Sequence, residues 1–327
     1  MSDKKHDELL IDHNHDGVDR RGFLKCMAWA GTGTLCVISG GVLKSFSLSR
    51  PFNSGGRDDL DAAAGKGELQ FVQISDSHMG FNKPANQDVA GTLKAAVEKI
   101  KALPNAPEFL LHTGDISHLS KPDEFDAVDQ ILKDTGKEVF FVPGEHDVLN
   151  DEGRQFLDRY GKGSSGAGWR SFDKNGVHFV GLVNVMNLKA GGLGMLGAEQ
   201  REWLEKDLQS RSKSTPIVIF AHIPLWSVYP QWGWGTDDAT QALSYVKGFG
   251  SVTVLNGHIH QIMQKVEGNV TFHTAASTAF PQPAPGTADS PGPMKVPAEQ
   301  LRKVLGITDV KFVRGQNALA VVDSNLA

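Results

Sequence analysis

The chain has 327 residues, of which 40% are hydrophobic and 22% charged, so it can form one large globular core or two smaller ones. This composition excludes a coiled coil, a collagen-like fibre and a chain that is disordered throughout. It contains 33 basic and 38 acidic residues, for a formal net charge of -5, which lacks the basic excess that binds nucleic-acid phosphates. No nucleic-acid partner is therefore expected.

The beginning of the chain has the order of charge and hydrophobicity that is typical of an export signal. Polar residues lead into Arg20-Arg21-Gly22-Phe23-Leu24-Lys25, and a mostly uncharged stretch follows from Cys26 to Leu43. That stretch is rich in glycine and also contains threonine and serine, so it is less hydrophobic than a stable membrane anchor of about 20 apolar residues. An export signal without a stable membrane anchor is therefore expected. The alternative is an anchor that spans the membrane once.

The run from Arg20 to Lys25 resembles the twin-arginine export motif, in which paired arginines are followed after one residue by Phe-Leu-Lys. The resemblance implies that the twin-arginine translocation machinery exports the folded protein to the periplasm or the exterior of a bacterium or archaeon. On this interpretation residues 1–50 are the signal region, residues 51–67 a flexible linker and residues 68–327 the folded domain. The alternative is a solvated basic segment before a buried helix.

The domain at residues 68–327 alternates short apolar runs with amphipathic segments, as an α/β sheet does. Strands are expected at 69–74, 109–111, 139–142, 177–182, 217–221 and 252–255, and helices at 89–103, 125–132, 198–208 and 239–249. A hairpin is expected at 262–273 with its turn at 267–269, and two long loops at 224–236 and 281–297, the second rich in proline. Because both cysteines, Cys26 and Cys36, precede this domain, its chemistry must use oxygen and nitrogen ligands.

Carboxylates and histidines follow several of these strands at the point where each one ends. They are Asp76, His78, Asp115, Glu145, His146, His222, His258 and His260. Polar ligands at the carboxyl ends of neighbouring strands converge on one crevice of an open α/β sheet. Imidazole and carboxylate suit zinc, manganese and iron, and a bridging carboxylate can hold two such ions about 3.5–4 Å apart. Two ions at that spacing polarise a phosphoryl group and lower the pKa of a bound water.

Five segments, taken in order, resemble the motifs of the calcineurin-like metallophosphoesterase family. They are Asp76-Ser77-His78, Gly114-Asp115, Gly144-Glu145-His146-Asp147, His222 and Gly257-His258-Ile259-His260. The resemblance covers residues 71–260 and implies an α/β fold, a four-layer α-β-β-α sandwich with two mixed sheets between helices. It also implies a dinuclear phosphoester hydrolase in which metal-bound hydroxide attacks phosphorus, with two divalent or mixed-valence ions of Fe, Mn or Zn.

The same resemblance implies a role for each matched residue. Asp76, His78 and His260 resemble the ligands of the first ion, and Asp115 the bridge between the ions. Glu145, His222 and His258 occupy the positions that hold the second ion. His146 matches the residue beside the leaving-group oxygen, and Asp147 the carboxylate that orients it.

Glu145 stands where asparagine is usual in the family. A third carboxylate reduces the charge of a site with two divalent ions from +2 to +1. We expect tighter metal retention, or a preference for one trivalent iron, with weaker attraction of a phosphate dianion. The alternative is that Glu145 turns away and the second site is weak.

Several residues outside these motifs are also candidates for the site. His118 follows Asp115 on a loop, where it either points into the same crevice, as a group that contacts substrate or supports a ligand, or is a surface histidine. Trp226 and Trp232 lie in the loop after His222, where they either stack a planar group or pack internally. Three further histidines on strands are expected to be structural: His112, His178 and His273.

The sequence therefore predicts an exported metal-dependent hydrolase of a small-molecule phosphoester. A phosphodiester is the first substrate class, because the members of the resembled family nearest in motif layout include cyclic-nucleotide phosphodiesterases. A phosphomonoesterase or nucleotidase is the alternative enzyme. A non-catalytic metal-binding scaffold of the same fold is the alternative that is not an enzyme. The sequence contains neither a phosphate-binding loop of the G-x-x-x-x-G-K type nor a G-x-S-x-G elbow, which disfavours a P-loop nucleotide hydrolase and a serine hydrolase.

Overall fold

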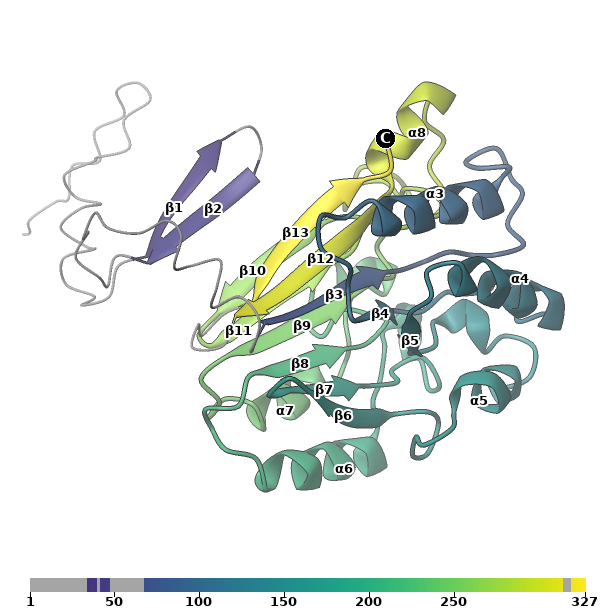
Figure 1. The fold of residues 1–327 in the computed structure, drawn as a ribbon. Helices are drawn as coiled ribbons and strands as arrows, with labels where there is room; N and C mark the ends of the chain where they lie inside the picture. The colour runs from purple at the N-terminus through teal and green to yellow at the C-terminus, as the bar shows by residue number, and fades with distance from the viewer. Residues whose placement is uncertain (1–33, 40–41, 48–67, 314–318) are drawn as a thin grey trace, which may run out of the picture. The chain divides into compact units, whose positions relative to one another are not determined.

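The computed structural model describes residues 34–39, 42–47, 68–313 and 319–327, and it divides into a unit at residues 1–63 and a unit at residues 64–327. The first unit contains one antiparallel pair of strands, β1 (Thr34–Ser39) and β2 (Val42–Ser47) (Figure 1). The twin-arginine motif at residues 20–25 and the linker expected at 51–67 lie outside the described residues. The signal region therefore stays a prediction.

The first sheet of the second unit has five strands in the order β13-β12-β3-β4-β5. Its strands β3 (Glu68–Ile74), β4 (Phe109–His112) and β5 (Glu138–Phe141) are parallel, with β5 at one edge. The strands β12 (Gly306–Val313) and β13 (Ala320–Asn325) extend it in antiparallel pairing, so the sheet is mixed. Neither β12 nor β13 was expected from the sequence.

The second sheet has six strands in the order β10-β11-β9-β8-β7-β6. The strands β7 (Val177–Gly181), β8 (Ile217–Phe220), β9 (Val252–Asn256) and β11 (Val270–Thr274) are parallel. The edge strands β6 (Arg170–Lys174) and β10 (Met263–Glu267) are antiparallel to their neighbours. The predicted hairpin is confirmed, and Gly268 at its turn has the positive φ of +61° that a tight turn requires.

Large apolar side chains from both sheets meet in a single cluster between them. Phe71 stacks on Phe109 in the first sheet, and both rings contact Phe179 of the second edge to face, with centroids 5.2 and 5.3 Å apart. The central strands are buried on both faces, which explains why they appear in the sequence as continuous apolar runs rather than alternating ones. The two sheets therefore form the inner layers of the domain.

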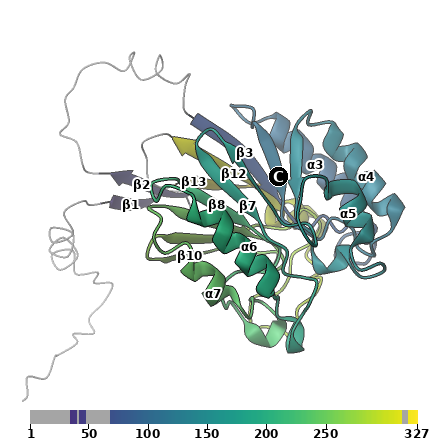
Figure 2. The same ribbon diagram turned by 90° about the horizontal axis from the view of Figure 1, so that it is seen from below.

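Helices form the outer layers (Figures 1 and 2). Buried residues of α3 (Val89–Lys101) and α4 (Pro122–Lys133) pack on the first sheet, and those of α6 (Ala198–Gln209) and α7 (Ala239–Ser244) pack on the second. The domain also contains the short helices α5 (Arg154–Tyr160) and α8 (Ala298–Val304), which were not expected. This arrangement is the predicted four-layer sandwich. In the described part of the chain, no helix has both the length and the hydrophobicity needed to cross a membrane.

The helix expected at residues 239–249 ends earlier, at Ser244. The backbone N–H groups of Tyr245, Val246 and Phe249 bond to carbonyls three residues back, so the chain continues in tight turns. Gly248 and Gly250 follow, and glycine is unfavourable in a helix interior. The apolar spacing of Val246 and Phe249 that suggested a longer helix instead fills the core under the second sheet.

Candidate metal centre

The predicted ligands come together at the carboxyl ends of β3, β4, β8 and β9 and in the loop after β5. This loop contains the 3-10 turn η1 (Glu145–Asp147). Five overlapping groups of three side chains could each hold a metal ion, because the ligand atoms within a group all lie within 4.8 Å of one another. All seven predicted ligands belong to at least one group. Strands from both sheets therefore contribute to one centre, as the sequence predicted.

The first group consists of Asp76, His78 and His260, all of them buried. Oδ1 of Asp76 lies 3.3 Å from Nε2 of His260, and the Nε2 atoms of His78 and His260 are 3.2 Å apart. One carboxylate oxygen and two imidazole nitrogens thus face a common point. This is a suitable set for one transition-metal ion.

The second group consists of Glu145, His222 and His258. Oε2 of Glu145 lies 2.9 Å from Nε2 of His222, and Oε1 lies 2.9 Å from Nδ1 of His258. The same two imidazole nitrogens are 3.3 Å apart. Glu145 therefore faces both histidines and does not turn away from the site.

Asp115 lies between the two groups. Its Oδ2 atom is 3.4 Å from Nε2 of His78 in the first group and 3.4 Å from Nε2 of His222 in the second. The other oxygen, Oδ1, accepts a hydrogen bond from the backbone N–H of His146 at 2.9 Å, which fixes the carboxylate plane. One oxygen shared by both groups is the geometry of a bridging ligand.

The backbone around these ligands is held in conformations that side chains rarely adopt. Five of the seven ligands have positive φ, between 40° and 71°: Asp76, His78, Asp115, His258 and His260. Such strained positions cluster at functional sites, where the surrounding structure compels them. The adjoining glycines allow the segments to approach, since a Cβ on Gly257 would lie 2.0 Å from Oγ of Ser75 and one on Gly114 2.5 Å from Nδ1 of His222.

Backbone carbonyls select the tautomers of two ligand histidines. Nδ1 of His222 lies 2.7 Å from the carbonyl oxygen of Thr113, and Nδ1 of His260 lies 2.5 Å from that of Phe280. In each ring Nδ1 must donate its proton to the carbonyl, which leaves the lone pair of Nε2 pointing into the centre. Both rings are therefore preset as metal ligands.

The donor set fits metal ions. Nε2 of His222 presents a lone pair to Oε2 of Glu145, and this buried oxygen accepts no hydrogen bond although the two atoms are close. Two facing lone pairs at that distance require a cation between them, either a proton or a metal ion. In the protein alone, burial lowers the pKa of His222, but Asp115 and Glu145 raise it well above its usual value. Glu145, Asp115 and His222 are thus arranged to bind a cation between Nε2 of His222 and Oε2 of Glu145.

The carboxylate of Asp76 is ionised at neutral pH. Burial would raise its pKa, but the neighbouring His260 and His222 lower it to about 2. The backbone N–H of His258 donates to both of its oxygens, at 3.0 and 3.2 Å. Asp76 is therefore a fixed anion, as a metal ligand must be.

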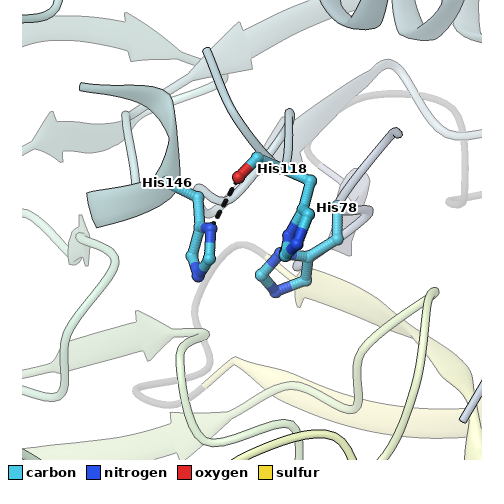
Figure 3. A group of neighbouring side chains, drawn as sticks. All are labelled: His78, His118 and His146. Atoms are coloured by element: carbon cyan, nitrogen blue, oxygen red, sulfur yellow. Dashed lines mark hydrogen bonds between the residues drawn. The ribbon is translucent and has the colours of Figure 1, made fainter. Parts of the chain in front are cut away.

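His146 and His118 stand side by side at the entrance to the centre, next to His78 (Figure 3). Their rings are stacked with centroids 4.8 Å apart, and Nδ1 of His146 lies 2.8 Å from the carbonyl oxygen of His118. His146 is thus oriented by a backbone carbonyl. Burial lowers the pKa of His146, but Asp115 and Glu145 outweigh it and raise the pKa above its usual value.

Asp147 does not contact the ring of His146, which corrects the expectation that this carboxylate orients it directly. Asp147 is fully buried and accepts hydrogen bonds from the backbone N–H groups of Ile116, Ser117 and Gly144 and from the hydroxyl of Ser117. It therefore holds together the two loops that contain His118 and His146. It positions His146 through the backbone, and its charge also acts to raise the pKa of that ring.

A cleft of about 340 Å³ opens over the metal centre, and several of its walls were not predicted. His118 and Trp232 line the cleft, as expected. Trp226 does not, because its ring packs against Phe272 in the core of the second sheet, with centroids 5.1 Å apart. The lining residues missed from the sequence are Leu188, Gly192, Trp234, Phe280, Gln282, Pro291, Gly292 and Pro293. Six of them lie in or next to the tryptophan and proline loops, whereas Leu188 and Gly192 gave no sequence signal.

The three histidines expected to be structural lie in the interior and not in the cleft. Nε2 of His112 lies 2.9 Å from Oγ of Ser77, and Nε2 of His178 lies 2.6 Å from Oδ2 of Asp207. Nε2 of His273 lies 3.0 Å from Oδ2 of Asp323. Each ring is buried and has a polar partner, so this prediction is confirmed.

The sequence and fold are similar to those of known proteins. The model of a family described as calcineurin-like phosphoesterase matches residues 69–262. A probable cyclic nucleotide phosphodiesterase of Psychrobacter arcticus is 23% identical over 230 residues, which cover 65% of this chain and 81% of the relative. A 3',5'-cyclic-nucleotide phosphodiesterase of a Nostoc species is 22% identical over 218 residues, covering 65% and 79%. The crystal structure of a dimetal phosphatase from Danio rerio superposes with a TM-score of 0.62 at 15% identity, covering 79% of this chain and 96% of that one. The last similarity concerns the fold alone and agrees with the predicted sandwich.

Proposed function

The chain belongs to the calcineurin-like phosphoesterase family and is a metallophosphoesterase, and we propose that its substrate is a phosphodiester of the cyclic-nucleotide class. The observation that carries the proposal is the charge of the cleft. No lysine or arginine is among the residues that line it, and the acidic ones are Asp115 and Glu145. A substrate in this cleft thus receives its electrostatic attraction from the metal centre and from His146 when that ring is protonated.

A charge count favours a diester over a monoester. Two divalent ions bring +4, and Asp76, Asp115 and Glu145 bring -3, so the loaded centre carries +1 before any hydroxide binds. A phosphodiester carries one negative charge and matches this value, whereas a monoester dianion near neutral pH carries nearly two and finds no lysine or arginine in the cleft to neutralise the second. An additional carboxylate at Glu145 therefore selects against dianions.

The walls of the cleft suit a planar, uncharged group attached to the phosphate. Trp232 and Trp234 meet edge to face with centroids 5.1 Å apart, and Phe280, which also lines the cleft, stacks with His78. Aromatic faces stack nucleobases without regard to base identity, at about 1–3 kcal/mol per base. The two relatives described above are named as a probable cyclic nucleotide phosphodiesterase and a 3',5'-cyclic-nucleotide phosphodiesterase, which supports a nucleotide as the substrate.

The chemistry divides between the ions and the side chains. When bound, two ions of Fe, Mn or Zn polarise the phosphoryl oxygens and lower the pKa of water. Asp115 and the six other predicted ligands would hold the ions. His146 commits its Nδ1 proton to the carbonyl oxygen of His118, so its Nε2 atom is the one that delivers a proton to the leaving-group oxygen.

We further propose that the protein is exported in its folded, metal-loaded state to the periplasm or cell exterior. The proposal rests on the sequence Arg20-Arg21-Gly22-Phe23-Leu24-Lys25. Replacing both arginines with lysine is expected to retain the protein in the cytoplasm, which cell fractionation measures. Unchanged export of this variant would contradict the assignment.

Hydrolysis assays test the proposed reaction. Metal-reconstituted protein is offered a 3',5'-cyclic nucleotide, a chromogenic diester and the matching chromogenic monoester, and Asp115→Asn is the inactive control. We expect diester hydrolysis with kcat/KM at least tenfold above that for the monoester. Preference for the monoester would identify a phosphomonoesterase, and absence of turnover with metal bound would identify a binding protein.

A further inference from the structure

We propose that His118 is a positioning residue that holds the metal ligand His78 through its side chain and His146 through its backbone carbonyl. His118 lies outside the seven ligands and lines the cleft between the two histidines that it contacts (Figure 3). The inference depends on the metal centre and not on the class of substrate.

The first step of the argument is the tautomer of His78. Its Nε2 atom faces the centre, 3.2 Å from Nε2 of His260 and 3.4 Å from Oδ2 of Asp115, so Nε2 is the atom that would bind the ion. A neutral imidazole that binds metal through Nε2 carries its proton on Nδ1. His78 must therefore donate a hydrogen bond from Nδ1.

The acceptor of that bond is the side chain of His118. The two Nδ1 atoms are 3.4 Å apart, and a hydrogen bond between them requires one to donate and the other to accept. Since His78 donates, Nδ1 of His118 accepts and the proton of His118 lies on Nε2. Metal binding at His78 thus determines the tautomer of His118 as well.

This contact differs from those of two other ligand histidines. His222 and His260 donate Nδ1–H to backbone carbonyls, which no substitution of the accepting residue removes. His78 instead depends on a side chain. A single substitution can therefore free its ring without changing any ligand.

The backbone of His118 is fixed from two directions. Its N–H group lies 2.9 Å from the carbonyl oxygen of Met79 and 3.1 Å from Oε2 of Glu124, and the next N–H, that of Leu119, lies 2.7 Å from the same Oε2 atom. Glu124 is buried, with 6% of its surface exposed. These contacts hold the carbonyl of His118 in place whatever side chain the residue has, so its bond to His146 should survive substitution.

Packing also restricts the ring of His118. One face stacks against His146 at an interplanar angle of 17°, and Phe81 meets the ring at 88° with centroids 5.2 Å apart. The ring therefore has little freedom to rotate away from His78. This order is what a positioning role requires, because an acceptor that moved would not constrain the ligand.

Zinc titrations of three variants test the proposal. Calorimetry measures Zn²⁺ binding to chelator-treated wild type, His118→Ala, His118→Asn and the control Leu188→Ala, which alters the cleft wall elsewhere. Losing the acceptor should weaken binding of one ion by about 10- to 100-fold in His118→Ala. Asparagine places its Oδ1 on Cγ, as histidine places Nδ1, so His118→Asn should remain within about threefold of wild type, as should Leu188→Ala.

Imidazole nitrogen NMR of the zinc-loaded wild type provides a second measurement that needs no variant. We expect Nδ1 of His118 to be unprotonated and Nε2 to carry the proton. Unchanged zinc affinity in His118→Ala, equal losses in His118→Ala and His118→Asn, or a proton on Nδ1 of His118 would each overturn the proposal. So would a third zinc ion in wild type that His118→Ala loses, because His118 would then be a ligand itself. None of these measurements uses turnover. A failure of this proposal can therefore be distinguished from a failure of the proposed substrate class.

Discussion

Oε2 of Glu145 lies 2.9 Å from Nε2 of His222, and Nδ1 of the same ring lies 2.7 Å from the carbonyl oxygen of Thr113. Because the carbonyl takes the Nδ1 proton, the imidazole directs a lone pair at a carboxylate oxygen. The pair is stable only with a cation between its atoms. Glu145 therefore occupies a ligand position, in the place where the family usually has a neutral asparagine.

Replacing Glu145 with asparagine should alter both metal retention and substrate preference. Loss of one negative charge changes the charge of the loaded centre from +1 to +2, which weakens the hold on the second ion and strengthens the attraction of dianions. We expect a second-site zinc dissociation constant raised about tenfold or more. The ratio of monoester to diester kcat/KM should rise about tenfold, equivalent to about 1.4 kcal/mol.

Glu152→Gln is the matched control for this prediction. It removes an acidic charge from an exposed residue seven positions further along the chain, outside the ligand set. Its metal affinity and substrate ratio should equal those of wild type. If Glu145→Asn also left both quantities unchanged, Glu145 would not be a ligand.

The metal centre was largely predictable from the sequence, whereas the cleft above it was not. Asp76, Asp115 and His222 follow the carboxyl ends of buried parallel strands within three residues, and such strand ends open onto a common crevice. The partner of His146 and the position of Trp226 depend on loop conformation, which local sequence does not determine. A tryptophan in a loop fits a cleft wall and a core position equally well, and only tertiary packing decided between Trp226 and Trp234.

Parts of the sheets were missed for a related reason. The outer strand β13 (Ala320–Asn325) interleaves exposed and partly buried residues and has no continuous apolar run. Its pairing partner β12 (Gly306–Val313) contains Asp309 and Lys311 among apolar residues. β13 is an edge strand, which needs fewer apolar side chains, whereas β12 lies inside the sheet and these two charged residues interrupt its apolar run.

Gly144→Ala should displace the predicted bridging carboxylate of Asp115, although the substitution changes no ligand. A Cβ at this position would lie 2.1 Å from Oδ1 of Asp115 and 2.3 Å from its backbone nitrogen, and neither atom can move without displacing the carboxylate. We expect a loss of about 2–4 kcal/mol in the free energy of unfolding, together with a zinc stoichiometry below two. Calorimetry and denaturant unfolding measure these quantities.

Gly248→Ala is the control for that substitution. Its Cβ would meet the side chain of Lys213 no closer than 3.5 Å, an ordinary contact, and its backbone φ is not positive. The variant should bind two zinc ions and unfold within about 1 kcal/mol of wild type. Wild-type zinc binding by Gly144→Ala would show that the loop adjusts and that the close approach is not needed.

Trp232→Ala should reduce selectivity for nucleotide substrates. Trp232 lines the cleft, whereas Trp226 packs against Phe272 away from it. Loss of one stacking surface should lower kcat/KM for a cyclic nucleotide by about tenfold and leave that for a small dialkyl phosphate within about threefold. Trp226→Ala should lower stability without changing this ratio. A uniform decrease for both substrates in Trp232→Ala would mean that the ring supports the loop and does not contact the substrate.

His112→Gln should make the stability of the metal-free protein less sensitive to acid. His112 is fully buried, with Nε2 2.9 Å from Oγ of Ser77, and burial lowers its pKa to about 3. Because the folded pKa is below the unfolded value of about 6.5, the neutral ring favours folding above pH 6.5, and that stability is lost as the pH falls. Between pH 7 and pH 5 the wild type should lose about 2 kcal/mol that the glutamine variant, which has no titrating group here, retains. Urea unfolding of both proteins at the two pH values measures this difference, and the other histidines cancel because both proteins contain them. Equal losses in the two proteins would show that His112 does not resist protonation in the folded state.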